Sequence, residues 1–129
     1  MIATAMATRT FALWVSPTGS FRLLEWGVAE TPHAALCSDT PQATRLTPDL
    51  TLWTDRDAIA LRRPRNAPAS ELLRAYQPHP GLHFGDVLFT GAAALDAGAP
   101  QGLTEDQALT LLDLYLLRSI PHVPASRLP

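Results

Sequence analysis

Residues 83–91, His-Phe-Gly-Asp-Val-Leu-Phe-Thr-Gly, contain the strongest β-strand signal in the chain. We predict a strand over His83–Thr90, because aliphatic and aromatic residues cluster there between Gly81 and Gly91. Gly85 interrupts the alternation of apolar and polar positions, which indicates a β-bulge.

A helix is predicted on the C-terminal side of this strand. Thr104–Gln107 (Thr-Glu-Asp-Gln) forms a capping box, in which the first and last side chains each satisfy a free backbone N–H group. We expect the helix to continue to about Ser119. Nine of the thirteen residues from Ala108 to Ile120 are apolar, which predicts a helix that is buried on most sides.

On the N-terminal side, a second helix is predicted from Pro68 to about Gln77, with Asn66 as its N-cap. Before it, Leu50–Thr54 and Ala58–Arg62 are interpreted as a β-hairpin that turns at Asp55–Asp57.

The first two predicted strands are Thr10–Ser16 and Phe21–Trp26, joined by a Pro- and Gly-containing turn. The stretch from Val28 to Pro48 shows no clear pattern, apart from a short helix around His33–Cys37.

These elements predict an α+β fold: a mainly antiparallel sheet of about five strands packed with two principal helices. We expect one domain over residues 10–120, a mobile N-terminus over residues 1–9 and an irregular tail over residues 121–129.

Composition excludes several kinds of chemistry. The chain has 129 residues and a net charge of −2, and all ten basic residues are arginine. Without lysine there is no Schiff base and no phosphate-loop lysine, and the single cysteine excludes an intrachain disulfide. Abundant alanine and arginine indicate a GC-rich bacterial genome. No segment is apolar enough to cross a membrane, so we expect a cytoplasmic protein.

Four segments together resemble a family of small domains of unknown function found in actinobacteria, related bacteria and their phages. The residues that carry the resemblance are Leu50–Asp55, Arg63–Ser70, Phe84–Gly91 and Gly102–Gln107. Ser70 departs from the family pattern, in which threonine is usual. The resemblance covers about half of the chain and implies a compact α+β domain of phage or mobile-element type, without implying a mechanism.

An arginine cluster is the leading candidate for function. Five arginines and three acidic residues lie between Asp55 and Arg74, so this segment has a charge of +2 and the rest of the chain −4. Arginines near a helix N-terminus suit a phosphate, a nucleotide or nucleic acid. We therefore predict a non-enzymatic protein that binds an anion through Arg62, Arg63, Arg65, Asn66, Ser70 and Arg74. The alternative is that these arginines are solvated or paired with nearby acids.

Two other functions stay open. Leu109, Leu112, Leu116 and Leu117 form either part of the core or the interface of a homodimer. An enzyme could instead use His79, His83 and Asp86. We predict no cofactor, and we name no catalytic residue or metal ligand.

Four further residues have a structural and a functional interpretation. Trp14, Trp26 and Trp53 are interpreted as core residues, with base stacking as the alternative. Cys37, close to His33, is interpreted as an inert thiol, with a nucleophile as the alternative.

Overall fold

A computed structural model describes residues 9–27, 29–93 and 100–119. Five strands form one antiparallel sheet in the order β2-β1-β5-β4-β3. The predicted α+β class is therefore confirmed. The strands are β1 (Phe11–Val15), β2 (Phe21–Glu25), β3 (Pro41–Thr47), β4 (Leu50–Asp55) and β5 (Val87–Thr90).

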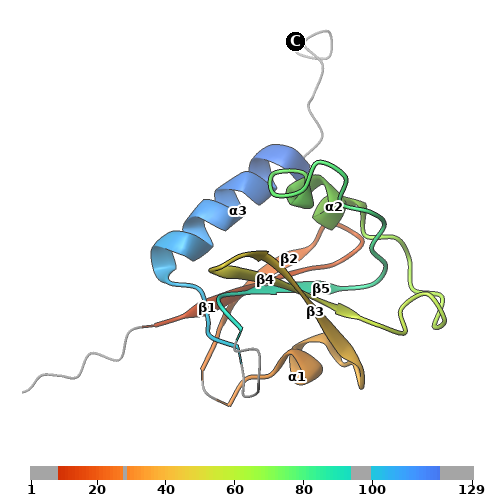
Figure 1. Ribbon diagram of the computed structural model, residues 1–129, viewed down its shortest axis with the longest axis horizontal. Coiled ribbons are helices and arrows are strands. Elements are labelled where there is room, and N and C mark those ends of the chain that lie inside the picture. Colours follow the sequence, from red (N-terminus) through yellow and green to blue (C-terminus); the bar gives the residue numbers. More distant parts are fainter. Residues whose placement is uncertain (1–8, 28, 94–99, 120–129) are drawn as a thin grey trace, which may run out of the picture.

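Three helices cover the two faces of this sheet (Figure 1). α2 (Ala67–Leu73) and α3 (Glu105–Ser119) pack against each other on one face, and the short α1 (Pro32–Leu36) lies on the other. The larger core lies under α2 and α3, and a smaller core lies under α1. The larger core includes Leu13, Val15, Leu52, Leu72, Phe89, Leu111 and Tyr115, and the smaller one Ala12, Trp26, Leu36 and Leu88.

Local hydrogen bonds explain the starts of the helices. In the predicted capping box, the Thr104 N–H donates to Gln107 Oε1 at 2.9 Å, and the Gln107 N–H donates to Thr104 Oγ1 at 3.1 Å. At the start of α2, the side-chain oxygen of Asn66 accepts from the Ala69 N–H at 3.0 Å, as an N-cap should. Both predicted caps are confirmed.

The predicted strand Ala58–Arg62 is wrong. The Asp55 carboxylate accepts the Asp57 N–H at 3.0 Å, and this bond bends the chain directly after β4. Helix-like bonds follow, such as Leu61 N–H to the Asp57 carbonyl at 2.9 Å. Arg62 has a φ of +58°, which is incompatible with a strand.

β4 pairs with β3, which sequence patterns missed. β3 is an edge strand, and Gln42, Ala43 and Arg45 on it are exposed. An exposed edge strand lacks the apolar alternation by which strands are recognised.

Two predicted elements are shorter in the structure. β5 begins at Val87, after Gly85, which has a φ of +77° and donates its N–H to the Pro64 carbonyl at 2.8 Å. Thus Gly85 ends an irregular segment before the strand instead of forming a bulge inside it. α2 ends at Leu73, before the predicted end at Gln77.

The prediction that α3 is buried on most sides is also wrong. Its buried positions are Ala108, Leu111 and Tyr115, and much of the rest of the helix is exposed. α3 packs against α2 and one face of the sheet, which cannot cover its whole circumference. Of the predicted terminal segments, residues 1–8 and 120–129 lie outside the described residues.

Candidate functional site

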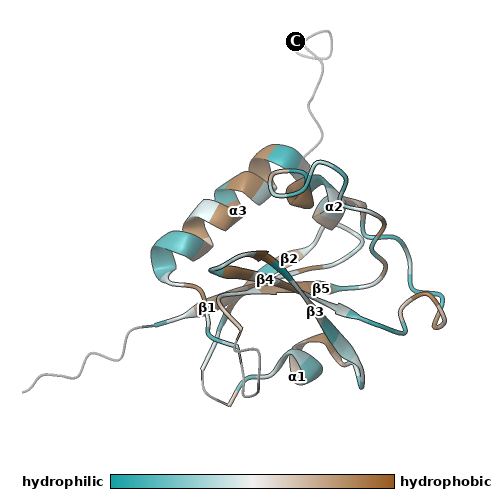
Figure 2. Ribbon diagram, in the orientation of Figure 1, coloured by the Kyte–Doolittle hydropathy of each residue, from teal (hydrophilic) through white to brown (hydrophobic). Residues whose placement is uncertain are grey.

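The segment from Asp55 to Arg65, which we call the arginine turn, connects β4 to the N-cap of α2. It projects from the body of the molecule, and its tip is hydrophobic (Figure 2). Backbone hydrogen bonds hold its shape. The Ala58 N–H donates to the Asp55 carbonyl at 3.1 Å, and the Arg63 N–H donates to the Ala58 carbonyl at 2.9 Å. The turn is therefore a fixed scaffold for its side chains.

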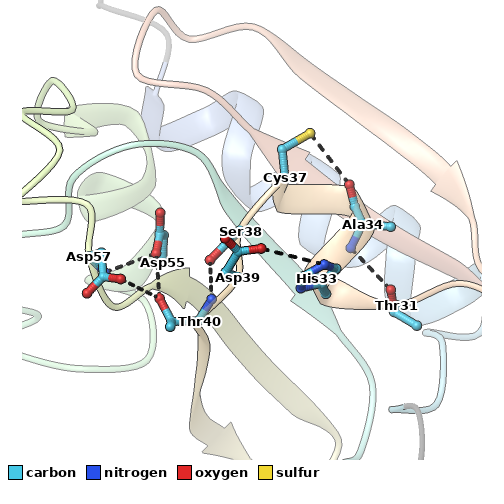
Figure 3. A network of polar contacts seen from close by, with 9 residues as sticks. All are labelled: Thr31, His33, Ala34, Cys37, Ser38, Asp39, Thr40, Asp55 and Asp57. Carbon is cyan, nitrogen blue, oxygen red and sulfur yellow. Dashed lines mark hydrogen bonds and ion pairs between the residues drawn. The ribbon is translucent and has the colours of Figure 1, made fainter.

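A polar network anchors the start of the turn (Figure 3). The Thr40 hydroxyl lies 3.1 Å from Asp55 Oδ1 and 3.0 Å from Asp57 Oδ2. Partial burial, the largest single effect, would raise the pKa of Asp55. Hydrogen bonds from the Asp57 N–H and from Ser38 and Thr40, together with the charge of Arg63, outweigh it and lower this pKa. Hydrogen bonds from the Thr40 hydroxyl thus hold the carboxylates of both Asp55 and Asp57 in place at the start of the turn.

Four arginines of the turn are exposed, and within the described part of the chain none of them forms an ion pair. They are Arg56, Arg62, Arg63 and Arg65. Arg74 differs, because its Nε lies 3.5 Å from a Glu71 carboxylate oxygen. Of the predicted anion ligands, Arg62, Arg63 and Arg65 therefore have free guanidinium groups, whereas Arg74 already has a partner.

Asn66 and Ser70 do not take part in the arrangement that the sequence predicted. Asn66 is completely buried, and its Nδ2 donates to the Val15 carbonyl at 3.1 Å and to the Gly85 carbonyl at 2.9 Å. Ser70 is buried too and donates to the Asn66 carbonyl at 3.2 Å. Asn66 therefore joins α2 to β1 and to the segment before β5, whereas Ser70 makes its bond within the start of α2, and both are structural residues.

Arg63 borders a hollow of about 190 Å³ that also contains Asp55, Asp86, Leu36 and Cys37 in its lining. Burial raises the pKa of Asp86, although the charge of Arg63 and a hydrogen bond from Trp14 partly oppose this increase. The charge of Arg63 thus acts on the carboxylates of Asp55 and Asp86, although it forms no ion pair with either. This interaction reduces its capacity to attract an external anion. Arg56, Arg62 and Arg65 are the stronger candidates.

A second hollow, of about 280 Å³, lies between the arginine turn, the β3–β4 pair and the segment before β5. Arg56 and Ile59 border it from the turn, and Leu82, His83 and Phe84 border it from the other side. Sequence patterns missed Ile59 and Leu82 as site residues, because Ile59 lies in the predicted strand Ala58–Arg62 and Leu82 lies outside every predicted element. The sequence does predict a turn at Asp55–Asp57, directly after a strand, and its error lies in the strand that it predicts over Ala58–Arg62.

The third hollow, of about 320 Å³, is bordered by Leu50, Tyr76, Leu103 and Leu111, with Asp49 and Asp106 among the other residues. Burial raises the pKa of Tyr76. Tyr76 is partly buried against the larger core, and no sequence pattern predicts this hollow.

The structure does not bring the two histidines of the alternative enzyme site to one hollow with Asp86, and His79 is exposed. His83 borders the second hollow and Asp86 the first, and His83 Nε2 lies 3.0 Å from the Pro80 carbonyl. Among the described residues, no group of three or more His, Cys, Asp or Glu side chains could hold a metal ion.

Cys37 and His33 also lack the geometry of a nucleophile and its base. Cys37 Sγ donates to the Ala34 carbonyl at 3.7 Å, while His33 Nε2 lies 4.0 Å from a carboxylate oxygen of Asp39 (Figure 3). Each of the two side chains has a different partner.

The three tryptophans have structural contacts. Trp26 is buried and its Nε1–H donates to the Pro100 carbonyl at 3.0 Å. Trp53 donates to the Thr90 hydroxyl at 2.9 Å, and Trp14 carries the guanidinium of Arg22 over its ring.

On α3, the four leucines of the predicted interface are divided. Leu109 and Leu117 are exposed, whereas Leu112 and Leu116 are partly buried against the larger core. Asp113, between the two exposed leucines, is exposed as well. The outer face of α3 is therefore only partly apolar.

Comparisons with models of known families, with curated proteins and with solved structures found no match for this chain. Within the described residues, no helix is both long and apolar enough to span a membrane.

Proposed function

We propose that this chain is a non-enzymatic binding protein that holds an anionic ligand on the arginine turn. The observation that carries the proposal is the set of exposed guanidinium groups on Arg56, Arg62 and Arg65, which have no ion-pair partner in the described residues. A guanidinium group is planar and donates two parallel hydrogen bonds to a carboxylate or a phosphate.

Helix α2 does not contribute to the proposed anion site. α2 has seven residues, and its N-cap position is filled by the buried Asn66 side chain. The anion is therefore held by side chains on an exposed turn, where water and salt screen each contact. Useful affinity requires several simultaneous contacts, so the ligand carries more than one negative charge. A phage or mobile-element role stays a proposal that rests on the family resemblance alone.

Titration of a fluorescent polyanion at low salt tests this function. The probes are a short DNA duplex and a poly-glutamate peptide. The double variant R62Q/R65Q removes two charges from the turn, and R9Q/R118Q removes two exposed charges elsewhere. We expect the turn variant to weaken binding of at least one probe about tenfold and to lower its salt dependence, because fewer counterions are released. The control variant keeps its affinity.

Two results would contradict the proposal. In the first, neither polyanion binds even at low salt. In the second, both double variants lose affinity equally, which would mean that attraction is spread over the whole surface rather than concentrated in the turn.

Self-association through α3 is a second candidate, favoured by the exposure of Leu109 and Leu117. Light scattering at micromolar concentration tests it. A dimer that dissociates in the L109S/L117S variant would support this function, and a monomer would exclude it.

A further inference from the structure

Exposed apolar side chains gather around the arginine turn. In the described part of the chain, six large apolar side chains are exposed, and three of them belong to the turn or to the facing segment. Ile59 is 70% exposed, Leu61 56% and Leu82 61%. Of these three residues, Ile59 and Leu82 line the same hollow, the second one described above. Apolar surface gathered at one place in this way is typical of a site that another molecule covers.

The side chains on both sides of the second hollow are held in place. Ile59 is on the hydrogen-bonded arginine turn, described above. On the other side, the Asn66 N–H donates to the His83 carbonyl at 2.7 Å, and Arg65 pairs with Phe84 in an isolated β-bridge. These bonds fix the backbone that carries Leu82. A binding surface that is already ordered loses less entropy when a ligand binds.

The lining of the hollow indicates the chemistry of its occupant. Ile59, Leu82 and Phe84 supply apolar surface, and Arg56 supplies a positive charge at the same hollow. The rest of the lining is largely polar and includes one carboxylate, that of Asp55, beside Gln42, Thr44, Thr54 and His83. Arg62 and Arg65 add exposed charges on the same turn. Large apolar side chains next to exposed arginines are typical of protein–protein interfaces. The complementary surface carries carboxylates around an apolar side chain.

Nucleic acid fits these residues less well. Binding of single strands relies on exposed aromatic side chains that stack on bases. The large apolar side chains exposed on the turn and on the facing segment, Ile59, Leu61 and Leu82, are aliphatic, and the rings of His83 and Phe84 at the hollow are only partly exposed. The three tryptophans are engaged elsewhere in the structure.

We propose that the arginine turn and the second hollow bind an acidic protein segment that inserts an apolar side chain between Ile59 and Leu82. This inference rests on the proposed function and specifies its ligand. The volume of about 280 Å³ suits one or two large side chains and lies just below the usual range of small-molecule pockets, about 300–1,000 Å³.

The test uses the full chain and a panel of labelled peptides in fluorescence anisotropy. Each peptide combines glutamates with two apolar residues, Leu or Phe, at varied spacing. Poly-glutamate of equal charge and a DNA strand of equal charge serve as comparison ligands. We expect at least one mixed peptide to bind about tenfold more tightly than poly-glutamate, because burying a large apolar side chain contributes about that factor.

The matched variants are I59S/L82S and L109S/L117S, which each replace two exposed apolar residues. The first should abolish the tenfold preference without changing poly-glutamate binding, and the second should leave the preference intact. Because Ile59 and Leu82 are largely exposed, neither change opens a cavity in the core. Circular dichroism confirms that both variants are folded.

Several outcomes overturn the inference, and they are distinguishable. If no mixed peptide exceeds poly-glutamate, the turn binds anions without an apolar contact and the proposed function stands. If DNA binds most tightly and I59S/L82S leaves it unchanged, the ligand is nucleic acid. If no peptide and no DNA binds at low salt, the proposed function fails together with the inference.

Discussion

Asn66 connects three parts of the molecule through one completely buried side chain. It caps α2 and donates to the carbonyls of Val15 and Gly85. Asn66→Ala should lower the free energy of unfolding by about 2–4 kcal/mol, because it removes the cap and leaves buried polar groups without partners. Urea denaturation measures this loss.

Ser70→Ala is the control for this substitution. Ser70 makes one bond to the Asn66 carbonyl, so its removal should cost only about 1 kcal/mol. Equal losses in the two variants would contradict the central role of Asn66.

Asp86 and Asp55 should affect stability in opposite directions at neutral pH. The pKa of Asp86 is raised above its ordinary value of 3.8, so its ionised form costs stability at neutral pH, and this cost disappears as the pH falls toward 3.8. Asp86→Asn should therefore stabilise the fold near pH 7 and lose this advantage on acidification. Urea unfolding between about pH 4 and 7 tests the prediction.

Asp55→Asn supplies the opposite case. The pKa of Asp55 is lowered, so its contribution is present above 3.8 and is lost as the pH falls below that value. This variant should be less stable than the wild type near pH 7, by about 1 kcal/mol. A gain in stability at neutral pH would contradict its role in the turn.

At the scale of elements, the end of β5 is joined closely to the segment before α3. The Gly91 N–H donates to the Gln101 carbonyl at 2.8 Å, and a Cβ at position 91 would lie 2.6 Å from the Gly102 carbonyl oxygen. Gly91→Ala should therefore force the two segments apart and destabilise the fold by about 2 kcal/mol or more. Thermal unfolding gives the measurement.

Gly27→Ala is the matched control, because nothing lies within 4 Å of a Cβ at that position. Its melting temperature should stay close to that of the wild type. A Gly91→Ala protein as stable as Gly27→Ala would mean that these segments separate at little cost.

At the scale of the whole molecule, the two faces of the sheet differ in their cores. Among the described residues, thirteen buried side chains form the core under α2 and α3, and four form the core under α1. We therefore expect amides of β5 and β1 to exchange slowly, by global unfolding, and those of α1 to exchange faster, by local opening. Hydrogen exchange with mass spectrometry measures both, and equal protection of α1 and β5 would contradict this prediction.

Features determined by short-range interactions could be predicted from the sequence. The capping box at Thr104, the N-cap at Asn66 and the first hairpin each depend on residues close together in the chain. Apolar content and periodicity were enough for the α+β class. The arginine cluster could also be recognised from the sequence, because its members lie in one continuous segment from Arg56 to Arg74.

Other features depended on contacts between distant segments, and only the tertiary structure decided them. β3 is a strand because β4 supplies its hydrogen-bonding partners, although its own residues are mostly polar. Ala58–Arg62 has apolar residues suitable for a strand, but the carboxylate of Asp55 bends the chain before it can pair. Packing between segments separated in sequence likewise brings Leu82 and Ile59 to the same hollow. It also decides which arginines, within the described residues, form no ion pair. Local patterns carry no information about such distances, because the contacts exist only once the chain has folded.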